Sequence, residues 1–170
     1  PFQRSSAYDI LVSSPTRVRI VSSLPPQNAD SRAFNEMLQI SSQTENLEKL
    51  RHFIQRMVSS SDLETTLHNR IVLAVDEAVS NIIEHGYPPT QPGHIRVEVQ
   101  ANATLFSILI RDSGRSFHPG EIADIDIRKH VQQGKRNGLG IFIMRQIMDE
   151  VDYSFQEGLE NTLRLVKYIT

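Results

Sequence analysis

The chain has 170 residues, of which 39% are hydrophobic and 22% charged, and this composition is typical of one ordinary globular domain. Eighteen basic against twenty acidic residues argue against direct nucleic-acid binding, and the lack of cysteine excludes disulfides and thiolate-bound metals. No apolar run approaches the roughly 20 residues that span a bilayer, and the first residues do not resemble a secretion signal. We therefore expect no membrane contact and a cytoplasmic location.

The first part of the chain differs from the rest. Residues 1–31 are rich in Ser and Pro, and they contain one short extended candidate at 17–21. Such a segment is typical of a linker, a pairing arm or a remnant of a longer polypeptide. We predict an N-terminal extension or linker over residues 1–34 and a single domain over residues 35–170.

The domain is expected to begin with a strand and a helix. Residues 36–40 fit a strand, and residues 44–59 fit a helix for which Thr44 is the predicted N-cap. The apolar stripe of this helix follows helical spacing. Its members are Leu47, Leu50, Phe53, Ile54 and Met57.

A second helix is indicated by apolar residues at helical spacing from Ile71 to Ile83, with no Pro or Gly until Gly86. At roughly 100° per residue, the polar residues share the opposite face. They are Glu77, Asn81, Glu84 and His85. Taken alone, this pattern also fits an ordinary solvated helix face with a histidine near its end.

Two strands should follow, at residues 95–100 and 105–111. Asp112 then lies where the second strand leaves the sheet, and Gly114 permits a tight turn beside the carboxylate. An aspartate held there can accept a hydrogen bond from an exocyclic amine. A plain Asx turn between the strand and the following loop is the alternative explanation of these residues.

Glycines at 134, 138 and 140 precede a predicted helix at 141–148, and Lys135 and Arg136 add positive charge. Backbone N–H groups at such a helix start bind phosphate, although a glycine-hinged surface loop without a ligand is the alternative. A hairpin around Gly158 should pair residues 151–156 with 162–169. The predicted fold is an α+β sandwich with a mixed, mostly antiparallel sheet and helices on one face.

These motifs, in this order, resemble the boxes of the GHKL superfamily of histidine kinase-like ATPases. The three boxes read Glu77-x-x-x-Asn81-x-x-x-His85, Asp112-x-Gly114-x-x-Phe117 and Gly138-Leu139-Gly140. The surrounding wording, from VDEAVSNIIEHGY to NTLRLVKY, looks like the anti-sigma factor serine kinases of the RsbW and SpoIIAB type. The resemblance covers residues 35–170 and implies the α/β sandwich of that superfamily, the Bergerat or HATPase fold.

The resemblance also implies roles in binding ATP and Mg²⁺. Glu77 matches the general base, and Asn81 matches the residue that holds Mg²⁺ against the phosphates. Asp112 matches the adenine-reading carboxylate, with Gly114 as its partner. Further matches to the nucleotide site are His85 at its edge, Phe117, Lys135, the turn of Gly138, Leu139 and Gly140, and Thr162, which would hold the adenine end through water.

The implied function is a protein serine/threonine kinase that phosphorylates a serine on an anti-sigma antagonist of the STAS type and can sequester a sigma factor. The family also suggests a homodimer formed through the sheet side. A nucleotide-dependent binding module without useful phosphoryl transfer is the alternative. A two-component histidine kinase is disfavoured, because no long coiled-coil segment precedes the domain.

Overall fold

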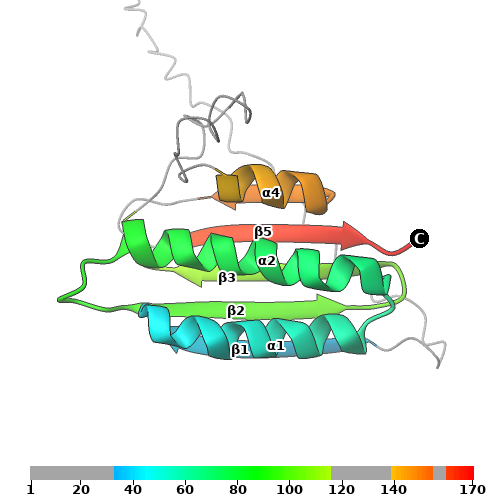
Figure 1. Ribbon diagram of the computed structural model, residues 1–170, viewed down its shortest axis with the longest axis horizontal. Coiled ribbons are helices and arrows are strands. Elements are labelled where there is room, and N and C mark those ends of the chain that lie inside the picture. Colours follow the sequence, from blue (N-terminus) through cyan, green and yellow to red (C-terminus); the bar gives the residue numbers. More distant parts are fainter. Residues whose placement is uncertain (1–32, 116–138, 155–159) are drawn as a thin grey trace, which may run out of the picture.

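The computed structural model describes residues 33–115, 139–154 and 160–170. Three helices, α1 (Leu47–Ser60), α2 (Thr65–Asn81) and α4 (Leu139–Ile147), lie side by side on one face of a single sheet, with α2 in the middle (Figure 1). Within the described residues no helix is long and apolar enough to cross a membrane. The predicted strand at 17–21 and the turn at Gly158 lie outside the described residues.

The sheet has five strands in the order β1-β2-β3-β5-β4, and each described pairing is antiparallel. The strands are β1 (Phe34–Ser41), β2 (His94–Ala101), β3 (Leu105–Asp112), β4 (Glu150–Ser154) and β5 (Asn161–Tyr168). The α+β sandwich with helices on one face is therefore confirmed, and the described sheet contains no parallel pair. The division at residue 34 stays a prediction, and β1 starts at Phe34.

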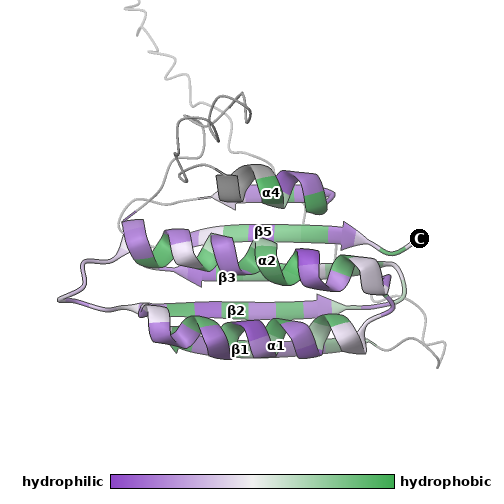
Figure 2. Ribbon diagram, viewed as in Figure 1, coloured by the Kyte–Doolittle hydropathy of each residue, from purple (hydrophilic) through white to green (hydrophobic). Residues whose placement is uncertain are grey.

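Alternation along the strands explains which face the helices cover. In β2, Ile95, Val97 and Val99 are fully buried, whereas the intervening side chains are exposed or half-buried. The predicted stripe of α1 is buried in full. Figure 2 shows the same arrangement, with polar residues on the outer surfaces of the helices. Apolar faces of helices and sheet therefore meet in one core.

The opposite face of the sheet carries ion pairs between neighbouring strands. Arg164 on β5 binds Glu150 at 2.7 Å and Asp152 at 2.8 Å, both on the neighbouring β4. Arg111 on β3 pairs with Glu98 on β2. None of the described helices covers this face (Figure 1).

The start of the first helix differs from the prediction. Thr44 is not an N-cap but the first residue of a short 3₁₀ turn, η1 (Thr44–Asn46), and α1 begins only at Leu47. Asn46 precedes Leu47 at the N-cap position of α1, and its side-chain amide donates to the Ser41 hydroxyl oxygen at 2.8 Å. The 3₁₀ turn moves the helix start three residues along the chain, so Thr44 cannot cap it.

The end of the second helix also differs. A π-turn, η2 (Ile82–Gly86), follows α2 directly. The regular 100° spacing used to place Glu84 and His85 on one face with Asn81 therefore stops at Asn81. Both side chains are exposed. Such π-turns are rare in proteins, and those that are found often lie at functional sites.

A first prediction concerns the core. Phe106 on β3 is completely buried, so Phe106→Ala should lower the free energy of unfolding by about 3–5 kcal/mol in urea titrations. Met37 on β1 is 56% exposed, and Met37→Ala should change it by less than about 0.5 kcal/mol. Comparable losses for the two variants would contradict the described core.

Candidate functional site

A pocket opens between α2 and α4, above the ends of β3 and β5. Its walls are mainly apolar and its few polar groups come from separate elements, an arrangement typical of small-molecule sites. The residues that line it are Ala78, Asn81, Ile82, Gly86, Asp112, Arg115, Met144, Arg145, Val151, Tyr153 and Leu163. The pocket thus joins the second helix, the Asp112 turn, the last helix and the last two strands.

The second helix contributes Asn81 to this pocket because its apolar stripe is fixed against the sheet. Ile71, Val75 and Val79 on α2 are fully buried, which sets the rotation of the helix about its axis. Asn81 is then half-buried at the pocket wall. An amide oxygen in this position is a ligand type that Mg²⁺ accepts alongside phosphates.

Glu77 lies one turn before Asn81 and is half-buried, but it is not among the residues that line the pocket. Burial raises the pKa of Glu77, and the carboxylates of Asp76 and Glu84 raise it further. A raised pKa is typical of a carboxylate that accepts a proton near neutral pH. His85 is also absent from the lining and is exposed.

Asp112 lies at the pocket floor and is only 5% exposed. Three donors point at the same oxygen, Oδ1. The Gly114 backbone N–H donates to it at 2.8 Å, the Asn161 side-chain amide at 3.1 Å, and the Tyr87 hydroxyl lies 3.5 Å away. A buried carboxylate needs such partners, because an unpaired buried charge is strongly unfavourable.

The other oxygen of Asp112, Oδ2, has no hydrogen bond to any described residue. Asp112 lines the pocket, and no described buried side-chain oxygen is left without a partner. Apolar walls beside a carboxylate oxygen that makes no hydrogen bond to the described residues fit a flat ring that carries an amine, as adenine does.

Gly114 is required by the close packing of this turn. A Cβ atom on Gly114 would lie 2.8 Å from the Gly86 carbonyl oxygen, 2.9 Å from the Tyr87 ring and 3.0 Å from Asp112 Oδ1. Only glycine lets the chain pass so close to the carboxylate. The backbone N–H of Arg115 then donates to the Gly86 carbonyl at 2.9 Å, which ties the turn to the end of η2.

Sequence reasoning selected Thr162, but the structure puts its neighbour Asn161 at the site. Asn161 is 3% exposed, and its amide donates to both Asp112 Oδ1 and the Gly114 carbonyl. Thr162 points to the other face of the sheet by strand alternation and does not line the pocket. Asn161 lies opposite Asp112 in the pairing of β3 with β5. The sequence pattern predicted a strand here but did not give its register against β3, so it could not identify Asn161.

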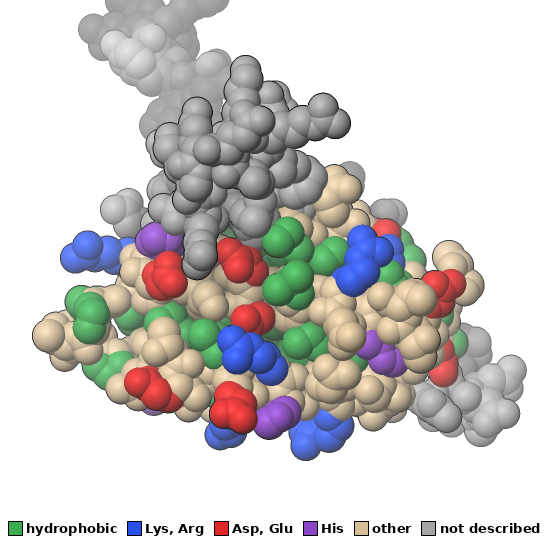
Figure 3. Space-filling model, viewed as in Figure 1, with side chains coloured by type: hydrophobic (Ala, Val, Ile, Leu, Met, Phe, Trp, Pro, Cys, Tyr) green, Lys and Arg blue, Asp and Glu red, His purple; other side chains and the backbone are tan. Residues whose placement is uncertain are grey.

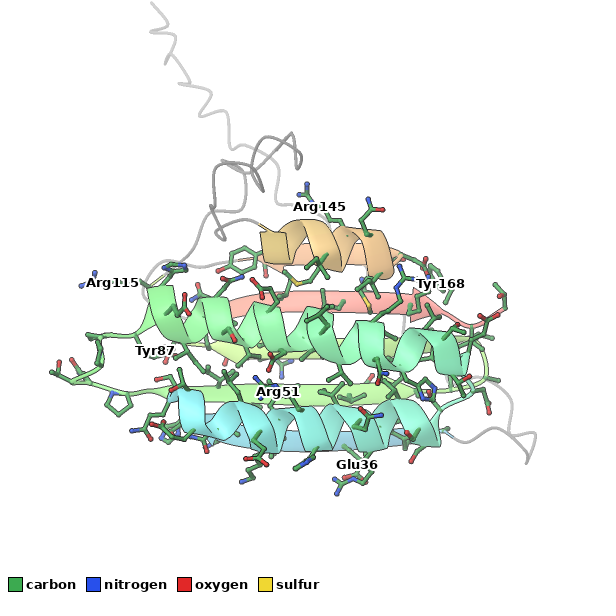
Figure 4. The ribbon with its side chains drawn as sticks, in the orientation of Figure 1. Glu36, Arg51, Tyr87, Arg115, Arg145 and Tyr168 are labelled. Atoms are coloured by element: carbon green, nitrogen blue, oxygen red, sulfur yellow. The ribbon has the colours of Figure 1, made fainter. Side chains whose placement is uncertain are left out.

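The last helix contributes Met144 and Arg145 to the pocket. Leu139 and Gly140 form its first turn, so the glycine motif does meet a helix start. Phe117, Lys135 and Gly138 lie outside the described residues. Sequence reasoning missed Arg115 and Arg145, two exposed arginines that line the pocket. Arg115 is at an unspecified position of the Asp112–Phe117 box, and Arg145 lies beyond the glycine motif. Figure 4 shows Arg115 beside the end of α2 and Arg145 on α4.

This chain is similar in sequence to known proteins. Residues 40–167 match the family described as histidine kinase-like ATPase domain. The chain belongs to this family. It is also 29% identical over 137 residues to the anti-sigma F factors of Bacillus thuringiensis (strain Al Hakam), Bacillus mycoides (strain KBAB4) and Bacillus cereus (strain AH187), a match that covers 80% of this chain and 94% of each relative.

Membership of this ATPase family implies that the domain binds a nucleotide. The likeness to three anti-sigma F factors supports the anti-sigma branch of the GHKL superfamily, as the motifs predicted. Charge on the surface agrees with the near-neutral composition. On the face shown in Figure 3, acidic and basic side chains are interspersed, without a basic patch.

A second prediction follows from the burial of Asp112. Burial raises the pKa of this carboxyl, against the hydrogen bonds from Asn161, Gly114 and Tyr87 that lower it, and the nearby Glu160 carboxylate raises it further. Only the ionised carboxylate is purely an acceptor for an amine. ATP affinity should therefore fall as pH falls through the pKa of Asp112, starting at a higher pH than for an ordinary aspartate.

Calorimetric titration with ATP across this pH range measures the effect. Asp112→Asn removes the titrating group, so its weaker ATP affinity should lose this pH dependence. An unchanged acid limb in the Asp112→Asn variant would mean that another group causes it.

Proposed function

We propose that the protein is an ATP-dependent protein serine kinase of the anti-sigma type. The observation that carries this proposal is the pocket itself, where a buried carboxylate, with one oxygen unbonded among the described residues, and Asn81 line the same mainly apolar cavity. Adenine would lie against Asp112 Oδ2, and Asn81 would hold Mg²⁺ beside the phosphates. The positive charges of Arg115 and Arg145 favour a polyanionic ligand in the same pocket.

The proposed substrate is a serine on a partner protein. Glu77 would take the proton of the serine hydroxyl while the serine oxygen forms a bond to the γ-phosphorus of ATP. The bond between that phosphorus and the β–γ bridging oxygen breaks at the same time, and ADP leaves. Phosphoryl transfer needs positioning and charge neutralisation more than a strong base. The raised pKa of Glu77 suits this role.

The partners are proposed from the relatives. The printed names of the matched proteins refer to sigma F, and by that likeness we propose a sigma factor as one partner of this chain. The phosphorylated partner would be an anti-sigma antagonist of the STAS type. The homodimer and the cytoplasmic location stay predictions.

A nucleotide-dependent binding module is the second candidate, and one observation favours it. Glu77 lies outside the residues that line the pocket, so a nucleotide seated against Asp112 and Asn81 does not by itself meet a base. In such a module ATP would order the partner surface without reacting. The two candidates differ in whether labelled phosphate appears on the partner.

A third prediction separates them. Glu77→Gln should keep ATP affinity but lower the rate of serine phosphorylation by about 10²-fold to 10⁴-fold, because the amide cannot take the proton. The assay is transfer of label from ATP to a STAS-type antagonist. Glu64→Gln at the exposed start of α2 is the control and should keep the parent rate. Transfer by the Glu77→Gln variant at the parent rate would disprove the base, and ATP binding by the parent without any transfer would favour the binding module.

A fourth prediction concerns the metal. Asn81→Ala should weaken ATP binding in the presence of Mg²⁺ by about tenfold or more, because a metal ligand is lost. With EDTA the parent and the variant should bind ATP with similar, weak affinity. Asn35→Ala on the exposed edge strand β1 is the control. An equal response of the parent and the Asn81→Ala variant to Mg²⁺ would contradict the assignment.

A further inference from the structure

We propose that Tyr87 is a positioning residue that orients the Asp112 carboxylate for purine recognition. The proposal rests on the ATP site proposed above. Tyr87 directly follows η2 and does not line the pocket, so it would act on the ligand only through Asp112. None of the motifs singled out in the sequence assigns it a role.

The ring of Tyr87 is held between two glycines. A Cβ atom on Gly93, just before β2, would lie 2.1 Å from ring carbon Cε1, and one on Gly114, just after β3, would lie 2.9 Å from Cε2. Real Cβ atoms essentially never come so close to another atom. The ring therefore fills the space between the start of β2 and the turn that follows Asp112.

The hydroxyl of Tyr87 contacts the same turn. It accepts a hydrogen bond from the Ser113 backbone N–H at 2.9 Å. Its single proton can go to the His94 carbonyl oxygen at 3.3 Å or to Asp112 Oδ1 at 3.5 Å. Both distances are longer than the usual 2.5–3.0 Å for a hydroxyl donor, so the firm bond is the one from Ser113.

These contacts fix consecutive peptide groups around the carboxylate. The Ser113 N–H is bonded to Tyr87 and the Gly114 N–H to Asp112 Oδ1. With Oδ1 held by these donors, rotation of the carboxylate is restricted, which leaves Oδ2 as the oxygen for the proposed purine contact. Asn161 supports the same oxygen from β5, so the turn is held from two sides.

Tyr87 also connects the two halves of the site. It continues the chain from Asn81 through η2, and the Gly86 carbonyl beside it accepts the Arg115 N–H. The distance between the helix that carries Asn81 and the carboxylate that faces the purine is therefore set by this short segment. Figure 4 shows Tyr87 at that end of α2, with Arg115 nearby and Tyr168 at the other end of the molecule.

Tyr87→Phe tests the proposal, because the ring and its packing against both glycines remain and only the hydroxyl is removed. Thermal unfolding should stay close to that of the parent. ATP affinity should fall by roughly threefold to tenfold, the value of one hydrogen bond, and the preference for ATP over GTP should narrow. Tyr168→Phe is the control, since Tyr168 is 47% exposed and remote from the pocket, and it should change neither quantity.

A measurement without ligand keeps this test separate from the proposed function. The Asp112 carboxyl can be titrated by carbon NMR in the free protein, where burial raises its pKa and the contact with the Tyr87 hydroxyl acts against that rise. Tyr87→Phe should raise the pKa of Asp112, and Tyr168→Phe should leave it unchanged. Arg115, Asn161 and Glu160 are the same in both variants.

An unchanged Asp112 titration in the Tyr87→Phe variant would overturn the positioning role. So would an unchanged preference between ATP and GTP in that variant when the parent binds ATP. If the parent binds no adenine nucleotide, the proposed ATP site fails, and the NMR titration still decides whether Tyr87 orients the carboxylate.

Discussion

The arrangement of the candidate site depends on one buried carboxylate. Asp112 is 5% exposed, and a charge in such a place is tolerated only when hydrogen-bond donors surround it. The donors come from three separate parts of the chain, the turn at Gly114, the segment after η2 at Tyr87, and β5 at Asn161. All three lie near Oδ1, the bonds from Gly114 and Asn161 being the shorter ones, and Oδ2 makes no hydrogen bond to the described residues.

This convergence depends on the packing of the helices. Fully buried side chains of α2, such as Ile71, Val75 and Val79, each contribute about 1.5–3 kcal/mol of burial and fix the helix against the sheet. Asn81 reaches the pocket wall as a consequence, and the chain beyond it is placed so that Gly86 and Tyr87 meet the Asp112 turn. The polar site and the apolar core are therefore parts of one arrangement.

Much of this could be predicted from the sequence because it follows from periodicity. The buried stripe of α1, the alternation of β2 and the position of Asp112 at the end of β3 were all readable from apolar spacing. Three features were not. The 3₁₀ turn before α1 and the π-turn after α2 change the angle between successive side chains over only a few residues. The apolar periodicity of a helix is read over a longer window, so it does not detect such short changes.

The third feature is the pairing register of β3 with β5. A shift of one residue exchanges the two faces of a strand, and this is the difference between Thr162 and Asn161. Arg115 and Arg145 were not predicted as site residues for a related reason. They meet at one pocket only because elements that are distant in the sequence pack together. Tyr87 is a similar case, because its importance lies in the space between Gly93 and Gly114.

The strand order has a consequence for how the protein reaches its native state. β5 follows β4 along the chain but is inserted between β3 and β4, and the Asp112–Asn161 contact joins residues 49 positions apart. Such non-local pairing is slow to form, because closing a long loop costs entropy before its contacts are made. A folding intermediate that has α2 and the β2–β3 hairpin would still lack the donor from β5. Competence to bind a purine would thus be acquired at the final closure of the sheet, and a ligand would stabilise the completed fold rather than guide its assembly.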